Sequence, residues 1–418
     1  MVAAESGGGT PCPAGETEFI QQGSAEFRRT VVALFSAGFA TFALLYCVQP
    51  LMPVLARSFG LNAAGSSLVL SVSTILLAGG LVFTGPISDA IGRKPVMVTA
   101  LLGAAACTLA SAVMPTWHGL LLMRALIGLC LSGLVAVAMT YISEEIHPKV
   151  LGFTMGLYIA GNAIGGMAGR LIVGVIVGFV SWRAAVGVMG GLALGAALVF
   201  WKILPASRHF RARPLRMANV LAGYKLHLRD RALPWLFLEG FLLLGAFVTL
   251  FNYISYRLLA APYNLSQAVV GSASAVYLTG IYSSTRVGAL ADRLGRRRVL
   301  WAVVGVMLAG VLITLAEPLW AILVGMLIFS FGFFGAHSVA SSWIGRRARQ
   351  ARGQASSLYL LCYYVGSSVA GTCGGVFWHV AGWTGVGLFI AGLLVVALIV
   401  ALHLIRVPAL AEAQSPGG

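Results

Sequence analysis

The chain alternates between long apolar runs and short clusters of basic or turn-forming residues. The runs are about 20 residues long and almost free of charge, the length with which an α-helix crosses a bilayer. Segments such as 192–200 and 385–401 are apolar at consecutive positions, whereas a membrane β-strand alternates polar and apolar side chains. The pattern predicts an all-α membrane protein with twelve membrane-spanning helices, at 30–51, 66–87, 96–114, 118–141, 150–178, 184–204, 233–256, 266–288, 299–316, 318–343, 354–379 and 383–405.

The predicted helices fall into two six-helix bundles. We expect a disordered tail over 1–29, a first bundle over 30–204, a linker over 205–232, a second bundle over 233–406 and a tail over 407–418. Placing the N-terminus in the cytoplasm puts 22 of the 28 lysines and arginines on that side, as the positive-inside rule requires. Both tails are then cytoplasmic, as is the basic linker with Arg208, Arg211, Arg213, Arg216, Lys225, Arg229 and Arg231.

Composition excludes a soluble globular domain. The 418 residues are 59% hydrophobic and 10% charged, and an ordinary soluble domain has about a quarter charged residues. The net charge of +16 follows from basic residues beside the spans, so we expect no nucleic-acid partner. The six cysteines show no paired spacing, and no His, Cys, Asp or Glu cluster has metal-ligand spacing. We therefore expect neither a metal nor a cofactor.

The two halves of the chain resemble each other. Such a repeat predicts two bundles related by an axis along the membrane normal, with substrate bound between them. The matching segments are 85–94 with 288–297 at a shift of 203, 152–165 with 353–366 at 201, and Trp182 with Trp383 at 201.

Each half carries a charged turn after its second span. The first has Gly85, Asp89, Gly92 and Arg93, and the second has Gly288, Asp292, Gly295 and Arg296. Glycine permits a tight turn, and the acid can lie against the positive N-terminal end of a helix. The turns resemble the signature motif of the major facilitator superfamily, although Ala90 stands where that family usually has a basic residue.

The resemblance covers nearly the whole chain beyond the N-terminal tail, and it implies a role for the turns. In that family they latch the two bundles together on the cytoplasmic side in the outward-open state. Carried over to this chain, Asp89 would face 352–353, and Asp292 would face 149–151.

Arg124 lies about seven residues inside the fourth span, where a charge normally faces protein or a water-filled cavity. It resembles the superfamily's fourth-helix arginine and is followed by Gly128, but Ile127 replaces the usual Gln. The resemblance implies a role in proton coupling. The alternative is an arginine that snorkels to the outer interface.

The fifth span has small residues at Gly152, Gly161, Gly165 and Gly169, which allow helices to pack closely. This frame resembles the antiporter motif of drug-efflux members, and the tract around it is most similar to the acriflavine-sensitivity branch. Gly166 replaces the family's Pro, and Arg170 replaces its final Gly. Generic small-residue packing is the alternative explanation.

Glu239 is the one carboxylate inside a predicted span, and a buried acid is a natural proton carrier. Alternatively, it is hydrated or salt-bridged near the cytoplasmic end. His337 is a second titratable group, or else a hydrogen-bonded packing residue. The residues predicted to line the cavity are Asn162, Arg170, His337, Tyr363 and Tyr364, with Tyr46, Gln49, Asn252, Tyr253, Tyr256 and Tyr277 as further polar or aromatic candidates.

The chain has no Gly-x4-Gly-Lys-Ser/Thr loop, so ATP is not expected to drive it. No catalytic cluster appears, so an enzyme is not expected, and the loops are too short for a receptor domain. We expect a monomeric secondary transporter of the bacterial plasma (inner) membrane that exports small apolar or amphipathic compounds by proton antiport. The alternative is proton-coupled uptake of a small polar or anionic metabolite, favoured by Arg124, Arg170 and Arg257.

Overall fold

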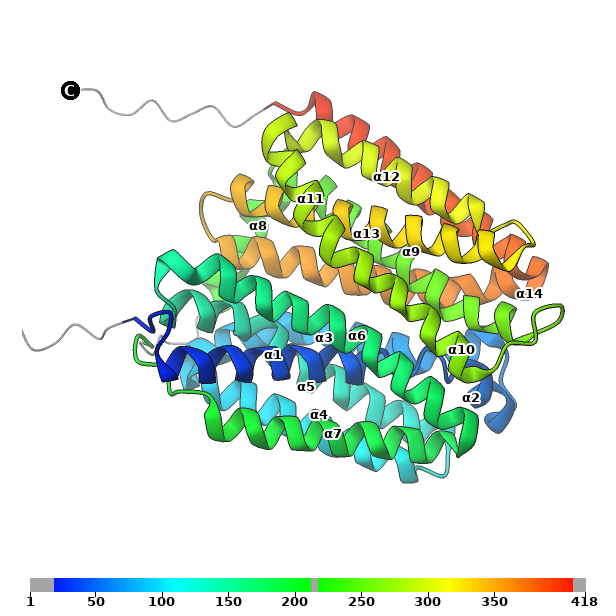
Figure 1. Ribbon diagram of the computed structural model, residues 1–418. Helices are drawn as coiled ribbons and strands as arrows, with labels where there is room; N and C mark the ends of the chain where they lie inside the picture. The colour runs from blue at the N-terminus through cyan, green and yellow to red at the C-terminus, as the bar shows by residue number, and fades with distance from the viewer. Residues whose placement is uncertain (1–18, 211, 213–216, 409–418) are drawn as a thin grey trace, which may run out of the picture.

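The computed structural model describes residues 19–210, 212 and 217–408. Residues 1–18 and 409–418 of the predicted tails, and Arg211, Arg213 and Arg216 of the linker, lie outside these ranges. The described helices form two bundles side by side, and α1 begins at the same end of the molecule as α14 finishes (Figure 1). We call this the terminal end, and we call the opposite end, where α2 and α10 lie, the distal end.

The first bundle follows the predicted spans with one added break. The first span is helical only to Tyr46, and a turn over 47–51 leads into a short helix with Pro53 in its first turn. A proline there sacrifices no helical hydrogen bond. The helices are α1 (Ala25–Tyr46), α2 (Met52–Phe59), α3 (Ala63–Ile91), α4 (Arg93–Val113), α5 (Trp117–Glu145), α6 (Leu151–Phe179) and α7 (Trp182–Ile203).

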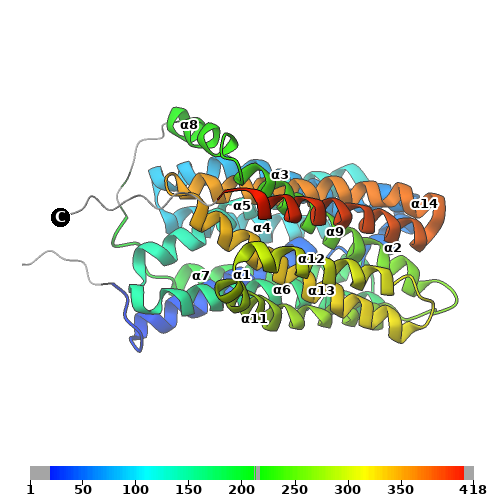
Figure 2. The same cartoon turned by 90° about the horizontal axis from the view of Figure 1, so that it is seen from above.

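The second bundle has two irregularities. Its second span is divided into α10, a 3-10 turn over Ala273–Tyr277 and α11, and its last two spans join in α14 across a bend at Ala381 and Gly382. A helix within the linker stands to one side near the terminal end (Figure 2). The helices are α8 (Met217–Leu228), α9 (Leu233–Leu259), α10 (Gln267–Ser272), α11 (Leu278–Leu294), α12 (Arg296–Ile313), α13 (Leu319–Arg347) and α14 (Arg352–Arg406).

Within the described ranges, nine helices are long and apolar enough to cross a membrane by themselves, with α14 taken as one. All twelve predicted spans overlap helical segments. The burial pattern also suits lipid, because large apolar side chains face outward, among them Phe83 (54% exposed), Trp201 (52%) and Leu388 (57%). A soluble monomer rarely exposes so much apolar surface.

Glycine contacts confirm the internal repeat. A Cβ on Gly165 would clash with the carbonyl oxygen of Phe39. Gly366 lies 201 positions later, and a Cβ there would clash with the carbonyl oxygen of Phe241. The α1–α6 contact is thus repeated between α9 and the first part of α14. The predicted packing position Gly152 differs, because no atom lies within 4 Å of where its Cβ would be. Gly161 and Gly169 do lie close to α1. A Cβ added at Gly161 would be 2.7 Å from the Phe35 carbonyl oxygen, and one added at Gly169 would be 2.7 Å from that of Ala43.

The two charged turns have the backbone that their glycines predict. Gly92 has φ +107° and Gly295 has φ +88°, a region that residues with a side chain rarely adopt. Each glycine ends one helix and begins the next within its own bundle, α3 to α4 and α11 to α12.

Asp230 fixes the start of α9, the helix that carries Glu239 and Asn252. Its Oδ1 accepts the backbone N–H groups of Ala232 (2.8 Å) and Leu233 (2.9 Å) and the Nε of Arg347 (3.1 Å). Burial acts to raise the pKa of the Asp230 carboxyl, but these hydrogen bonds outweigh it and leave the pKa below its ordinary value.

Candidate functional site

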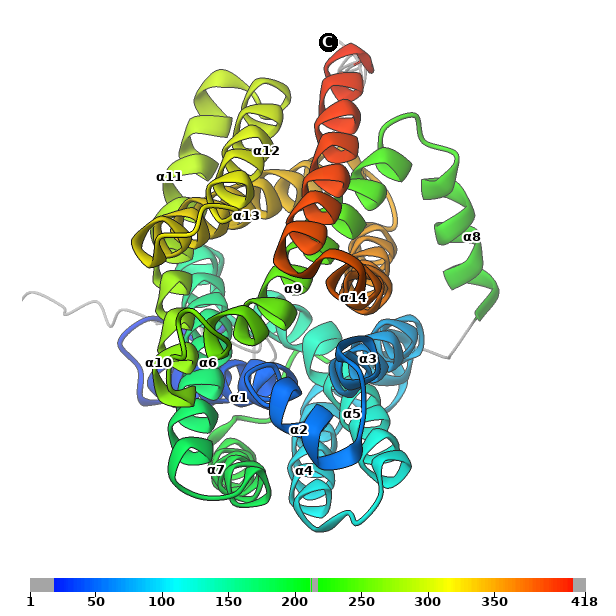
Figure 3. The same ribbon diagram turned by 90° about the vertical axis from the view of Figure 1, so that its right-hand side faces the viewer.

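The two bundles are joined at the distal end. Hydrogen bonds connect Ser66 Oγ to the Tyr256 hydroxyl (2.6 Å), Thr372 Oγ1 to Ser71 Oγ (2.7 Å) and Gln49 Nε2 to Asn252 Oδ1 (2.7 Å). Between described residues, every hydrogen bond from α1–α7 to α9–α14 involves the distal half of these helices. Figure 3 looks onto this end, with α10 between α6 and α9 and with α2 over the first bundle. The structure is therefore closed distally.

Gln49 and Asn252 lie at the centre of this junction. They are 203 positions apart, within one residue of the shift of 202 that relates Phe39 of α1 to Phe241 of α9, so the two bundles contribute side chains from nearly the same place in the repeat. Arg170 Nε donates to Gln49 Oε1 at 2.6 Å, and Gln49 Nε2 donates to Asn252. All three side chains are buried, with exposed fractions of 3%, 1% and 0% for Arg170, Gln49 and Asn252.

Arg170 has a buried charge without an acidic partner among the described residues. Its Nη1 donates to the Gly166 carbonyl at 2.5 Å, and its guanidinium carbon lies 4.6 Å from the Tyr46 ring centre and 4.5 Å from that of Tyr277. Such cation–π contacts offset part of the desolvation cost. A small cavity beside it is lined by Gln49, Pro50, Arg170, Phe251, Ile254, Ser255, Val270, Gly271, Ala273, Ser274 and Met326.

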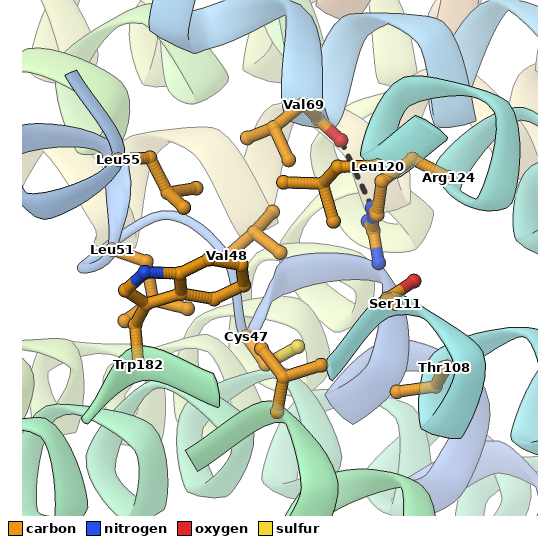
Figure 4. A pocket seen from close by; sticks show the side chains of 11 residues that line it. Cys47, Val48, Leu51, Leu55, Val69, Thr108, Ser111, Leu120, Arg124 and Trp182 are labelled. Carbon is orange, nitrogen blue, oxygen red and sulfur yellow. Dashed lines mark hydrogen bonds between the residues drawn. The ribbon is translucent and has the colours of Figure 1, made fainter. Parts of the chain in front are cut away.

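Arg124 is bound very differently. Its Nε, Nη1 and Nη2 donate to the backbone carbonyls of Val69 (2.9 Å), Leu44 (2.9 Å) and Leu45 (2.8 Å). The last two lie in the final turn of α1, where carbonyls lack helical partners and the helix dipole favours a cation. Figure 4 shows the bond to Val69 in a small pocket within the first bundle. At 2% exposure, Arg124 does not snorkel, and it fastens α1 to α3 and α5.

Arg257 also caps a helix. Its guanidinium donates to the carbonyls of Thr314 and Ala316, just beyond the end of α12. Of the three arginines expected to favour an anion, Arg170 is therefore the one that is not saturated by carbonyls at a helix end.

Glu239 lies within the second bundle with 0% exposure. Neither carboxyl oxygen has a hydrogen-bond partner among the described residues, so the alternative of a salt bridge does not hold in this structure. The ring of Tyr359 lies over the adjacent Gly240, with its Cε2 2.5 Å from where a Cβ would be. The equivalent position in the first half, two residues before Phe39, is Ala37, so the acid is a feature of one bundle.

An aromatic cluster continues from this acid toward Arg170. His337 Nδ1 lies 2.8 Å from the Tyr359 hydroxyl, and the His337 ring lies 4.8 Å from that of Tyr363. Tyr363 is edge-on to Tyr364, at 5.3 Å. The cluster then runs through Phe333 and Phe247 to Phe251 and Tyr277 beside Arg170.

The structure brings together most, but not all, of the predicted cavity residues. His337, Tyr363 and Tyr364 belong to one cluster, whereas Asn162 lies within the first bundle against Gly38 of α1. Sequence reasoning missed Tyr359 and Phe247. Tyr359 could have been found from the repeat, in which it matches Tyr158. Nothing in the sequence distinguishes Phe247 from other phenylalanines that face lipid or the core.

The predicted latch residues pair within their own bundles in this conformation. Asp89 contacts Arg93 at 2.5 Å, and Arg93 also binds Glu144 at 2.7 Å. In the second bundle, Asp292 contacts Arg296 at 2.6 Å and Arg346 at 3.2 Å. The cross-bundle partners implied by the resemblance belong to a state closed at the terminal end, so the latch stays a prediction.

These features define a class of protein: two repeated helical bundles that enclose a polar and aromatic site at their junction. The Major Facilitator Superfamily model matches residues 34–260 and 249–418, and the chain belongs to that superfamily. It is a multi-pass membrane transporter and not an enzyme.

Individual relatives agree with this assignment. The chain is 62% identical to the "Inner membrane transport protein YnfM" of Escherichia coli over 93% of each chain. It is 45% identical to the "Uncharacterized MFS-type transporter YybF" of Bacillus subtilis, over 93% of this chain and 96% of that one.

Solved structures share the fold at low identity. A bacterial homologue of the human lysosomal transporter Spinster, solved in an inward-facing and unoccupied conformation, superposes with a TM-score of 0.75. It is 13% identical and the match covers 92% of this chain and 98% of that chain. The nucleoside transporter NupG superposes with a TM-score of 0.73 at 16% identity, over 90% and 99% of the two chains. At these identities the likeness concerns the fold alone.

Proposed function

We propose that this protein is a proton-coupled antiporter of the inner membrane that exports small apolar or amphipathic compounds by alternating access. It crosses the membrane twelve times as a monomer, with both termini in the cytoplasm. The observation that carries the proposal is Glu239, a buried acid that has no hydrogen-bond partner in the described part of the chain and that lies beside an aromatic cluster reaching the junction of the bundles. The fifth-span resemblance to drug-efflux members supports the direction of transport.

The environment of Glu239 suits a carrier of one proton. Among the described residues, an ionised carboxylate at this position would have neither a counter-charge nor a hydrogen bond to replace water, which is costly. We therefore infer that it holds a proton while the site is dry and releases the proton when rearrangement of the bundles admits water. His337 and Tyr359 are the titratable groups on the neighbouring helices, and they offer a route for the proton.

The proposed orientation rests on the positive charges. The arginines of the second turn and those that end α13 lie at the terminal end with the linker, and basic residues favour the cytoplasmic side. In this orientation the hydrogen-bonded distal end faces away from the cytoplasm, the arrangement expected of a site that receives an internal substrate.

Export predicts a phenotype. Cells that overexpress the protein should tolerate several unrelated amphipathic compounds better than cells that carry an empty vector, and deletion should do the reverse. The minimal inhibitory concentrations of a compound panel measure this, with Glu239→Gln as the inactive control. Unchanged tolerance to the whole panel would overturn the export proposal.

Arg170 supports a second candidate, which is symport of a small polar or anionic metabolite into the cell. The first span also lacks the acid that drug–proton antiporters often carry there. Reconstituted vesicles distinguish the two directions: an inward proton gradient drives substrate out under antiport and in under symport.

The latch yields a separate prediction. Asp89→Asn should impair transport severely while leaving thermal stability almost unchanged, because Arg93 keeps its bond to Glu144. The Asp89 side chain is itself 43% exposed, and an ion pair of an exposed acid contributes only about 0–1 kcal/mol. The affected contact would be the one made when the terminal end closes. Transport in vesicles and the unfolding temperature in detergent measure the two effects.

Glu317→Gln is the matched control, since it removes an exposed acid at the distal end. The latch assignment fails if Asp89→Asn transports as well as this control.

A further inference from the structure

We propose that Arg170 recognises a substrate that joins an aromatic ring to a carboxylate, and that Gln49 is the internal group which this carboxylate displaces. The inference rests on the proposed transport function and adds the chemical class of the substrate. It holds for either direction of transport, because it concerns the atoms that meet the substrate at the junction of the bundles.

The charge of Arg170 is not compensated by an acid among the described residues. A buried guanidinium without a carboxylate is expensive, and such a group inside a membrane protein normally faces a partner or a pathway. Arg124 and Arg257 donate to backbone carbonyls at helix ends. Arg170, in contrast, donates to one carbonyl of its own helix and to a neutral side-chain amide. Because Arg170 replaces a glycine of the family pattern, helix packing does not require it.

Aromatic rings surround the guanidinium of Arg170. Tyr46 and Tyr277 place their rings within 4.6 Å of it, and Phe251 lies at 5.6 Å. These are planar apolar walls of the kind that an aromatic ring stacks against. The Tyr277 hydroxyl is buried and has no hydrogen-bond partner among the described residues, which leaves a donor free for a second polar atom of the ligand.

The hydrogen-bond chain from Arg170 through Gln49 to Asn252 has a fixed direction. Arginine can only donate, so Gln49 must present its oxygen to Arg170 and its N–H to Asn252. The Gln49 oxygen thus stands where a carboxylate oxygen would bind. A carboxylate forms a charge-assisted bond with arginine that is roughly twice as strong as a neutral one, so it can replace the amide.

Displacement has a consequence for the bundles. When Gln49 leaves Arg170, its donor orientation toward Asn252 is no longer enforced, and a central bond between the bundles at the distal end is weakened. Substrate binding then favours opening of that end, because a ligand shifts a conformational equilibrium by its differential affinity for the two states.

The test uses the purified full-length protein in detergent and two pairs of probes, salicylate with salicylamide and phenylacetate with phenylacetamide. Titration calorimetry should show that each carboxylate binds more tightly than its amide. Arg170→Gln should weaken binding of the carboxylates by at least about tenfold, the value of a hydrogen bond to a charged group, and leave the amides unchanged. Arg57→Gln, which removes an exposed arginine of α2 at the same end, should change neither.

Gln49 variants keep the test decisive if Arg170→Gln does not fold. Gln49→Ala removes the internal competitor, so carboxylate affinity should rise by about threefold or more. Gln49→Glu supplies a permanent internal carboxylate, so it should abolish carboxylate binding. Equal affinity for acids and amides, no binding of either acid, or Gln49 variants without effect would each overturn the inference. Proton movement that depends on Glu239 would survive such a result, so the transport proposal is judged separately.

Discussion

Glu239→Gln is expected to abolish proton movement coupled to transport while leaving the exchange of substrate down its gradient. Gln has the same size as Glu but cannot carry a proton, and Glu239 is the one acidic residue of α9 (Leu233–Leu259). One charge moved through 100 mV supplies about 2.3 kcal/mol, or roughly fiftyfold accumulation. That accumulation should be lost. Proteoliposomes with a pH-sensitive dye inside measure the proton flux, and labelled substrate measures the exchange.

The same vesicles provide the controls for Glu239. Glu317→Gln removes an exposed acid elsewhere and should keep normal coupling. His337→Gln tests the proposed proton route, and it should slow coupled proton flux without abolishing it, because water can replace a relay group but not the carrier. If Glu239→Gln shows the same substrate-driven proton flux as the unaltered protein, the proton site lies elsewhere.

Gly165→Ala is expected to lower the free energy of unfolding by about 3 kcal/mol, the upper end of the usual cost of overpacking. The added methyl group would clash with the Phe39 carbonyl oxygen of α1, and backbone at a helix contact cannot move aside as a side chain does. The unfolding temperature in detergent, followed by circular dichroism, measures the change. Gly366→Ala should act alike against Phe241, because the repeat places the same contact in the second bundle.

Gly152→Ala is the matched control for this helix contact. It lies in the same helix, but its Cβ position is open, so alanine should be neutral or slightly stabilising, since it favours helix by about 1 kcal/mol relative to glycine. An unfolding temperature for Gly165→Ala equal to that of Gly152→Ala would contradict the packing described here.

The helices were predictable because their signal is local. A run of apolar residues long enough to cross a bilayer must satisfy its own backbone, so it becomes a helix wherever it is placed. The deviations occur where this signal is weak. Gln49 and Pro50 interrupt the first span, and the small residues Gly271, Ser272 and Ala273 coincide with the break between α10 and the 3-10 turn. These interruptions lie where the bundles meet, so irregular backbone is found beside the site.

The sequence by itself determined the all-α membrane fold, the two-bundle repeat, the glycine turns and the presence of a few costly polar groups in apolar helices. Only the tertiary structure decided what those groups do. Arg124 and Arg170 look alike in the sequence, but one meets the end of α1 and the other meets Gln49 and two tyrosine rings. The reason is physical: the cost of a buried charge depends on which acceptors reach it. The acceptors outside the arginine's own helix come from positions about 55 to 120 residues away, which no local pattern specifies.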